Sequence, residues 1–144
     1  MWQDERALVG LSRRECLAML RTEVVGRAVF TERALPAVIP VSYAVLDDAL
    51  VFATRTGSRL AAAAQGGVLA LEVDRLDPPT RTGWSVVVTG LPEDIVGLAE
   101  QARALSVLDT WAPGRQDLLL RLPLTVVSGR QIVAEPFAPA VPIG

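Results

Sequence analysis

The sequence VFATRTGSRLAAAA, residues 51–64, predicts a strand that passes through a tight turn directly into a helix. Its first apolar and aromatic residues favour a strand that ends at Thr54. Gly57 suits a tight turn, and Ser58 is a preferred residue for capping the start of a helix. We therefore expect a short helix over Ser58–Gln65, closed by the glycines at 66 and 67.

The segments on either side of this stretch indicate mostly strands joined by short turns. They are rich in β-branched and apolar residues and are bounded by glycine, proline or aspartate. The last residues, 135–144, are rich in proline and are expected to be extended. We expect strands at Val24–Thr31, Ala37–Val45, Ala49–Thr54, Val68–Asp74, Trp84–Leu91, Leu118–Leu122 and Leu124–Val133.

Two further segments predict helices. Ser12 and Glu15 have the spacing of a capping box at the start of a helix over Ser12–Arg21. The segment Asp94–Leu108 has helical periodicity. Six or so short strands with these helices predict one mainly β domain over residues 1–144, a small antiparallel barrel decorated by helices. The apolar stripe of the later helix would consist of Ile95, Leu98, Ala99, Ala102, Leu105 and Leu108.

The composition excludes several kinds of catalytic site. The chain of 144 residues has one cysteine, Cys16, and no histidine, and all 14 of its basic residues are arginine. Serine–histidine and cysteine–histidine catalysis, multi-cysteine zinc sites and lysine Schiff bases are therefore excluded, and no metal site is expected. Any redox or group-transfer chemistry would come from a bound cofactor.

Charge and hydropathy bear on partners and location. A net charge of −2 and a pI near 5.1 argue against nucleic-acid binding. The sequence has no apolar run of roughly 20 residues and no signal-peptide pattern, so we expect a cytoplasmic protein without membrane spans. The hydrophobic content of 51% and mean hydropathy of +0.36 are high for a small monomer and predict a homodimer.

The turn at residues 54–59 is a candidate anion site. The first turn of a helix has unpaired amide groups and a partial positive charge, both of which favour a bound phosphate. The hydroxyls of Thr54 and Ser58 and the guanidinium of Arg59 would add donors. The alternative is that Ser58 only caps the helix and that Arg59 is solvated.

Two other stretches are candidates for contact with a flat ligand. In RTGWSVVVTG, residues 81–90, Trp84 and Ser85 come at the start of a strand, although a large aromatic residue there usually packs in the core. In PAVIPVSY, residues 36–43, Pro40 indicates a strand edge or a bulge with free backbone groups. The alternative is an edge strand that is merely protected against aggregation.

Taken in order, these stretches resemble the flavin-binding split β-barrel proteins related to pyridoxamine 5′-phosphate oxidase. The resemblance extends over residues 11–133. Its most specific part is the strand–TxxGSRL–helix segment followed by GWSVxVxG. The matching motifs are VVGRAVF (24–30), PAVIPVSYAV (36–45), VFATRTGSRL (51–60), LEVDRLD (71–77), RTGWSVVVTG (81–90) and SGRQI (128–132).

The resemblance implies a six-stranded antiparallel split β-barrel that binds FMN, or a deazaflavin analogue, at the interface of a homodimer. The phosphate would lie at the turn before the short helix, and the isoalloxazine ring along the strand at 40–43. A residue of the second subunit, Arg130, would complete the pocket. The implied cofactor contacts are Pro40, Val41, Ser42, Tyr43, Thr54, Ser58, Arg59, Leu60, Trp84, Ser85 and Arg130.

The chain departs from true pyridoxamine phosphate oxidases at several positions. Leu60 stands where those enzymes have a lysine, Ala53 where relatives often have an arginine or a larger residue, and there is no histidine for their substrate-binding pair. We therefore expect a flavin-dependent oxidoreductase acting on a different small-molecule substrate. The alternatives are a deazaflavin-dependent reductase and a non-catalytic flavin-carrying dimer. Tyr43 could donate a proton, or it could be a core residue, and no catalytic residue is assigned.

Overall fold

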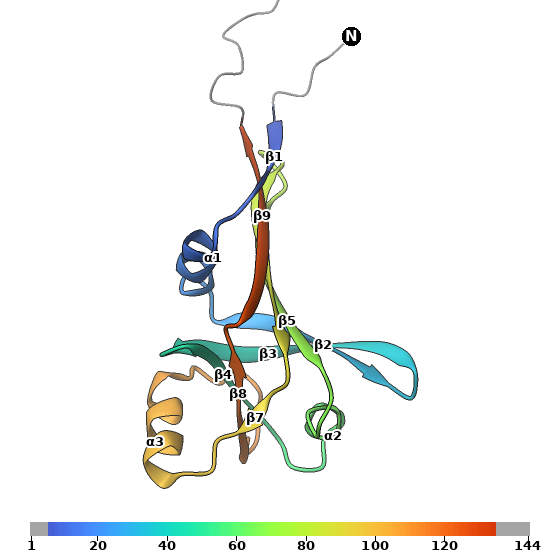
Figure 1. Ribbon diagram of the computed structural model, residues 1–144, viewed down its shortest axis with the longest axis vertical. Helices are drawn as coiled ribbons and strands as arrows, with labels where there is room; N and C mark the ends of the chain where they lie inside the picture. The colour runs from blue at the N-terminus through green and yellow to red at the C-terminus, as the bar shows by residue number, and fades with distance from the viewer. Residues whose placement is uncertain (1–5, 135–144) are drawn as a thin grey trace, which may run out of the picture.

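The computed structural model describes residues 6–134, whose nine strands form one antiparallel sheet (Figure 1). The sheet order is β1-β9-β6-β5-β2-β3-β4-β8-β7. The strands are β1 (Arg6–Gly10), β2 (Val25–Glu32), β3 (Leu35–Leu46), β4 (Ala49–Thr54), β5 (Leu69–Asp77), β6 (Thr82–Gly90), β7 (Glu93–Asp94), β8 (Leu118–Pro123) and β9 (Val126–Ala134). The helices are α1 (Arg13–Leu20), α2 (Arg59–Ala63) and α3 (Leu98–Val107).

The mainly β antiparallel fold is confirmed, but the seven expected strand segments, counted as six or so in the predicted barrel, are fewer than the nine strands observed. Strand β1, which was not predicted, pairs with β9 along its whole length from Arg6 to Gly10. Strand β7 was not predicted either, and it pairs only with part of β8. Both strands are defined by a partner distant in the chain, so local patterning does not identify them. The predicted extended tail, 135–144, lies outside the described residues.

The barrel is split because β3 has two different neighbours. From Leu35 to Ser42 it pairs with β2, whereas its pairing with β4 begins only at Tyr43. Within the described sheet, the stretch before Tyr43 is therefore paired on one side only. Pro36 and Pro40 lie in this stretch, as expected for a residue that lacks an N–H and is tolerated at a strand edge. The predicted edge position of Pro40 is confirmed.

Helices α1 and α2 begin where their caps predict. Ser12 and Glu15 form the complete capping box of α1, and Ser58 caps α2 by accepting a hydrogen bond from the amide of Ala61. Cys16 and Leu20 of α1 are buried in the main core, between the helix and the inward face of the sheet. Within residues 6–134, no helix is long and apolar enough to cross a membrane.

Helix α3 differs most from the prediction. It begins at Leu98 rather than Asp94, because residues 93–94 extend and pair with β8. Of the predicted apolar stripe, Leu98 is 85% exposed and Leu105 is 56% exposed. The helix packs instead through Ala104, which is buried with Val51, Ile95 and Leu119. Its small side chain lets α3 lie close to the sheet, and the larger apolar residues face outward.

Tyr43 fastens α1 to the sheet from within the core. Its side chain is 1% exposed, and its hydroxyl donates a 2.6 Å hydrogen bond to the carbonyl oxygen of Leu20, at the end of α1. Burial, with a smaller effect from the charge of Glu23, raises the pKa of Tyr43 above its usual range. The hydroxyl therefore stays protonated and structural.

We predict that Tyr43→Phe lowers the free energy of unfolding by about 1–2 kcal/mol, because the Leu20 carbonyl loses its buried donor. Chemical denaturation of the purified chain measures this change. Unchanged stability, accompanied by a loss of ligand binding, would contradict a core role for Tyr43.

Gly129 of β9 allows α1 to lie against the sheet. A Cβ atom at this position would lie 2.7 Å from Sγ of Cys16 and 3.1 Å from Cδ1 of Leu11.

We predict that Gly129→Ala lowers the free energy of unfolding by about 1–3 kcal/mol through overpacking. In a Cys16→Ala background the loss should be smaller, because the closest contact is gone. Equal losses in the two backgrounds would show that α1 is not the element displaced.

Candidate functional site

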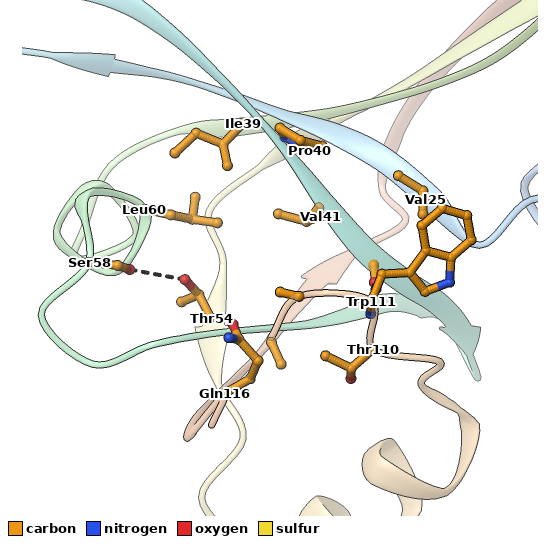
Figure 2. A pocket seen from close by; sticks show the side chains of 13 residues that line it. Val25, Ile39, Pro40, Val41, Thr54, Ser58, Leu60, Thr110, Trp111 and Gln116 are labelled. Carbon is orange, nitrogen blue, oxygen red and sulfur yellow. Dashed lines mark hydrogen bonds between the residues drawn. The ribbon is translucent and has the colours of Figure 1, made fainter. Parts of the chain in front are cut away.

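A cavity of about 390 Å³ lies where β4 diverges from β3 (Figure 2). It is bounded by the free edge of β3, the end of β4, the start of α2 and the chain between α3 and β8. Its volume falls within the range of roughly 300–1,000 Å³ that is typical of small-molecule sites. The lining residues are Val25, Ile39, Pro40, Val41, Ser42, Ala53, Thr54, Ser58, Leu60, Thr110, Trp111, Ala112 and Gln116.

Apolar side chains make up most of the wall. Ile39, Pro40 and Val41 approach from the edge of β3, and Leu60 approaches from the first turn of α2 (Figure 2). Trp111, which is 65% exposed, lies at the side of the cavity near Val25. The arrangement suits a flat, largely apolar ring.

The polar end of the cavity is the turn between β4 and α2. The hydroxyls of Thr54 and Ser58 share a 2.9 Å hydrogen bond, drawn as a dashed line in Figure 2, and Ser58 Oγ also accepts from the amide of Ala61 at 3.1 Å. Gly57 makes the turn with a φ of 84°. The predicted turn and helix cap are therefore confirmed, and both hydroxyls line the cavity.

A second hollow of about 470 Å³ adjoins this polar end. It lies between the turn at residues 54–58 and the loop at residues 112–116, and it shares Thr54, Ser58, Ala112 and Gln116 with the first cavity. The two spaces thus form one site with an apolar part and a polar part.

The loop after α3, residues 109–117, closes one side of both spaces. It is held at two points that are distant in sequence. The amide of Trp111 donates to Oγ of Ser42 at 3.0 Å, and Oδ1 of Asp117 accepts from the amide of Thr56 at 2.8 Å. The hydrogen bond from Thr56 keeps the pKa of Asp117 below its usual range, so this carboxylate remains a charged acceptor.

This loop was not predicted as part of a site. Thr110, Trp111, Ala112 and Gln116 all line the cavity, and none of them was a candidate. The available signal was the large aromatic residue in WAPG, residues 111–114, since an aromatic side chain in a proline- and glycine-containing loop has no obvious core to enter. Val25, Ile39 and Ala53 were missed as well, because their apolar character indicated only a core.

The structure brings six of the predicted contacts to the cavity: Pro40, Val41, Ser42, Thr54, Ser58 and Leu60. Tyr43 is directed into the core instead. Arg59 lines neither space, and its Nε donates to Oε2 of Glu32 at 2.6 Å. A contact of these two residues with a ligand remains a prediction.

Trp84, Ser85 and Arg130 lie away from the cavity of their own chain. They belong to β6 and β9, and β5 and β2 separate these strands from β3 in the sheet. Trp84 is buried on the inward face, whereas Ser85 and Arg130 are paired on the outward face. Their predicted contact with a ligand would require a second copy of the chain.

The lining of the first cavity has no acid or base that titrates near neutral pH. Its polar side chains are hydroxyls, one amide and one indole, and it contains no carboxylate, thiol or guanidinium. Within residues 6–134 there is also no group of acidic, cysteine or histidine side chains that could hold a metal ion. Hydrogen bonding, rather than proton transfer near neutral pH, is therefore the chemistry that the side chains of this lining offer.

Comparison with known proteins gives concordant results. Rv0080 of Mycobacterium tuberculosis, itself uncharacterized, is 37% identical over 142 residues, which cover 95% of this chain and 93% of that protein. The structure of an FAD-binding protein from Mesorhizobium loti is 27% identical with a TM-score of 0.75, and the match covers 89% of this chain and 98% of that protein. The structure of an FAD-binding protein from Mycobacterium smegmatis is 26% identical with a TM-score of 0.69, and the match covers 87% of this chain and 98% of that protein.

The family model for pyridoxamine 5′-phosphate oxidase matches residues 12–131, which include every strand from β2 to β8, most of β9, and the whole cavity lining. The expected resemblance is confirmed over most of the chain, together with its split-barrel fold. This chain belongs to the pyridoxamine 5′-phosphate oxidase family.

Proposed function

We propose that this chain binds a flavin nucleotide in the cavity beside β3 and acts as a flavin-dependent oxidoreductase on a small-molecule substrate. The observation that carries the proposal is the cavity itself. It has apolar walls, a polar end and a volume of about 390 Å³, and it lies between the strand and the turn that the family resemblance implies as flavin contacts. The FAD-binding character of two similar structures supports a flavin ligand.

The residues present fit such a ligand. An isoalloxazine ring is planar, and Ile39, Val41 and Leu60 offer it an apolar wall. The free edge of β3 has backbone groups available for the polar edge of the ring, and Ser42 adds a hydroxyl. A bound flavin would supply the hydride or electron transfer, while the chain would orient the ring and limit its contact with water.

The adjoining hollow bears on which flavin is bound. FMN needs space only for a ribityl phosphate, whereas FAD adds a second phosphate and an adenosine. The second space of about 470 Å³ could receive a phosphate-bearing extension of either ligand. The second space does not distinguish these ligands. FMN, which the family resemblance implies, stays the proposed cofactor, and FAD and a deazaflavin are the alternatives to compare.

We also propose that the active form is a homodimer built on the outward face of the sheet. The strand register puts exposed apolar residues on this face, among them Leu8, Val38, Val126 and Ile132. The same register puts Pro40 and Ser42 of the cavity there, as well as Ser85 and Arg130. A second copy on this face would cover apolar surface and bring its own Ser85 and Arg130 toward the cavity.

Titration of the purified chain with FMN, FAD and a deazaflavin, followed by flavin fluorescence and absorbance, tests the proposal. We expect a saturable complex with FMN or FAD, and we expect Trp111→Ala to weaken it by about 1 kcal/mol because an aromatic face beside the ring is lost. The exposed Arg14→Gln on α1 is the control and should bind like the unaltered chain.

Reduction of the complex by nicotinamide donors then separates an oxidoreductase from a flavin carrier. Tight binding of the deazaflavin alone would favour a deazaflavin-dependent reductase. A flavin complex that no donor reduces would favour a non-catalytic flavin-carrying dimer. If none of the three ligands binds, the proposed function is wrong.

A carboxylate pair on the proposed dimer face predicts a pH-dependent stability. Nη1 of Arg27 lies 3.3 Å from Oε1 of Glu72 and 3.1 Å from Oδ2 of Asp74. Burial is the main cause that raises the pKa of Glu72 to about 7, and the neighbouring Asp74 adds to it. Because the folded chain then binds a proton that the unfolded chain has released, stability should fall as pH rises through about 7.

We predict that the melting temperature, measured at one protein concentration, decreases from about pH 5 to pH 8. Glu72→Gln should flatten this profile, because its neutral side chain does not titrate. Glu100→Gln, which alters an exposed carboxylate of α3, is the matched control and should keep the slope. A profile that Glu72→Gln leaves unaltered would contradict the assignment.

A further inference from the structure

We propose that a second small-molecule site lies between α3 and the sheet and that it binds a free amino acid as its zwitterion. The site is a hollow of about 140 Å³, which we call the α3 hollow, bounded by Glu100 and Arg103 of α3 and by Val51 and Arg121 of the sheet. It shares no lining residue with the two spaces of the proposed flavin site. Binding there would therefore be a function beyond the proposed one and independent of it.

The floor of the α3 hollow follows from the way α3 packs. The helix lies beside β7 and β8 (Figure 1), and Ala104 makes its close contact, buried with Val51, Ile95 and Leu119. One turn earlier on the same face of the helix, the longer Glu100 lines the hollow. Val51 and Ile95 line it from the other side, so the hollow has an apolar floor beneath charged side chains.

Arg121 brings to the hollow a buried hydrogen-bond donor that has no acceptor. The strand register pairs Arg121 with Val51 of β4, on the face of the sheet that α3 covers. The side chain is 38% exposed, but its Nε is buried and forms no hydrogen bond, and Oε1 of Glu93 is 3.5 Å away. Among the buried nitrogen and oxygen atoms of the partly or fully buried side chains in residues 6–134, only this one lacks a partner. Because such a donor destabilises a fold, we expect a ligand to supply the acceptor.

The other charged side chains of the hollow leave one carboxylate available. At the rim, Nη2 of Arg103 lies 3.0 Å from Oδ2 of Asp47, and both of these side chains are more than half exposed. Glu100 forms no ion pair within residues 6–134. The hollow thus offers a guanidinium donor at Arg121 and a carboxylate acceptor at Glu100.

The balance of charge indicates the class of ligand. In the lining, Asp47 and Glu100 balance Arg103 and Arg121. A simple anion bound by Arg121 would also lie near two carboxylates, and a simple cation bound by Glu100 would lie near two guanidinium groups. A zwitterion matches both signs, because its carboxylate can accept from Nε of Arg121 while its ammonium donates to Glu100.

The size and the floor of the hollow indicate the side chain of the ligand. A volume of about 140 Å³ is below the roughly 300 Å³ at which typical small-molecule sites begin, so the hollow is too small for a nucleotide or a flavin. The apolar floor at Val51 and Ile95 would contact a short aliphatic side chain. The α3 hollow therefore fits a small aliphatic amino acid such as alanine or valine.

Calorimetric titration of the purified chain with L-alanine and L-valine tests this site. We expect saturable binding and a rise in melting temperature, because a ligand that binds only the folded chain stabilises it. Two analogues of valine serve as controls: 3-methylbutanoate lacks the ammonium group, and isobutylamine lacks the carboxylate. Each should bind at least about tenfold more weakly than valine, because one charged hydrogen bond is lost.

Variants of the two charged contacts test the orientation of the ligand. We expect Arg121→Met and Glu100→Gln each to weaken valine binding by about 10- to 150-fold, the range for a charged hydrogen bond. Arg121→Lys keeps the positive charge and should retain part of the affinity. Asp94→Asn is the matched control, because it neutralises an exposed carboxylate of β7 that does not line the hollow. It should leave the dissociation constant of valine unchanged.

The stability of the chain without ligand separates a binding role of Arg121 from a structural one. A donor that serves a ligand is unsatisfied in the free chain, so Arg121→Met should leave the melting temperature of the free chain unchanged or raise it. The same variant should abolish the rise in melting temperature that valine causes in the unaltered chain.

Three results would overturn the proposed amino-acid site. The first is that neither alanine nor valine binds saturably. The second is that 3-methylbutanoate or isobutylamine binds as tightly as valine, because a single charge would then be sufficient. The third is that Arg121→Met lowers the melting temperature of the free chain and leaves valine binding unaltered, which would give Arg121 a structural role.

Discussion

At Tyr43, strand β3 passes from pairing with β2 to pairing with β4, and the site depends on this change of neighbour. A strand edge with free backbone groups is normally a place where chains aggregate. Here Pro36 and Pro40 remove two of its donors, and the loop at residues 109–117 and the start of α2 face it across a cavity. The buried bond from Tyr43 to Leu20 joins α1 to β3 where the two pairings meet.

Features whose cause lies within a few residues could be predicted from the sequence. The capping box at Ser12, the cap at Ser58 and the turn at Gly57 satisfy backbone groups of their own segment, and all three are present. The same reasoning gave the edge position of Pro40. Two of the walls of the cavity, the strand edge and the capped turn, could therefore be predicted from local features.

The features that could not be predicted from the sequence depend on partners that are far away in the chain. Periodicity identified an apolar stripe on α3, but it cannot say which side meets the sheet, and the contact is made by the smaller Ala104 while Leu98 remains exposed. Trp111 reaches the cavity because its amide bonds to Ser42, which is 69 residues earlier. The pair between Arg59 and Glu32, 27 residues apart, was likewise not visible in the motif, and the contact of Arg59 with a ligand stays a prediction.

The lining of the cavity also constrains the chemistry that the proposed flavoprotein could perform. Its hydroxyls, amide and indole do not exchange protons near neutral pH, so a proton needed during reduction of a substrate would have to come from solvent or from the substrate itself. Access of water to the ring would then matter more than any single side chain. For a ring bound in this cavity, that access would depend on the outward face of the sheet, where Pro40 and Ser42 lie beside the Arg27–Glu72–Asp74 cluster. A second copy bound there would set both the solvation of these carboxylates and the supply of protons to the site.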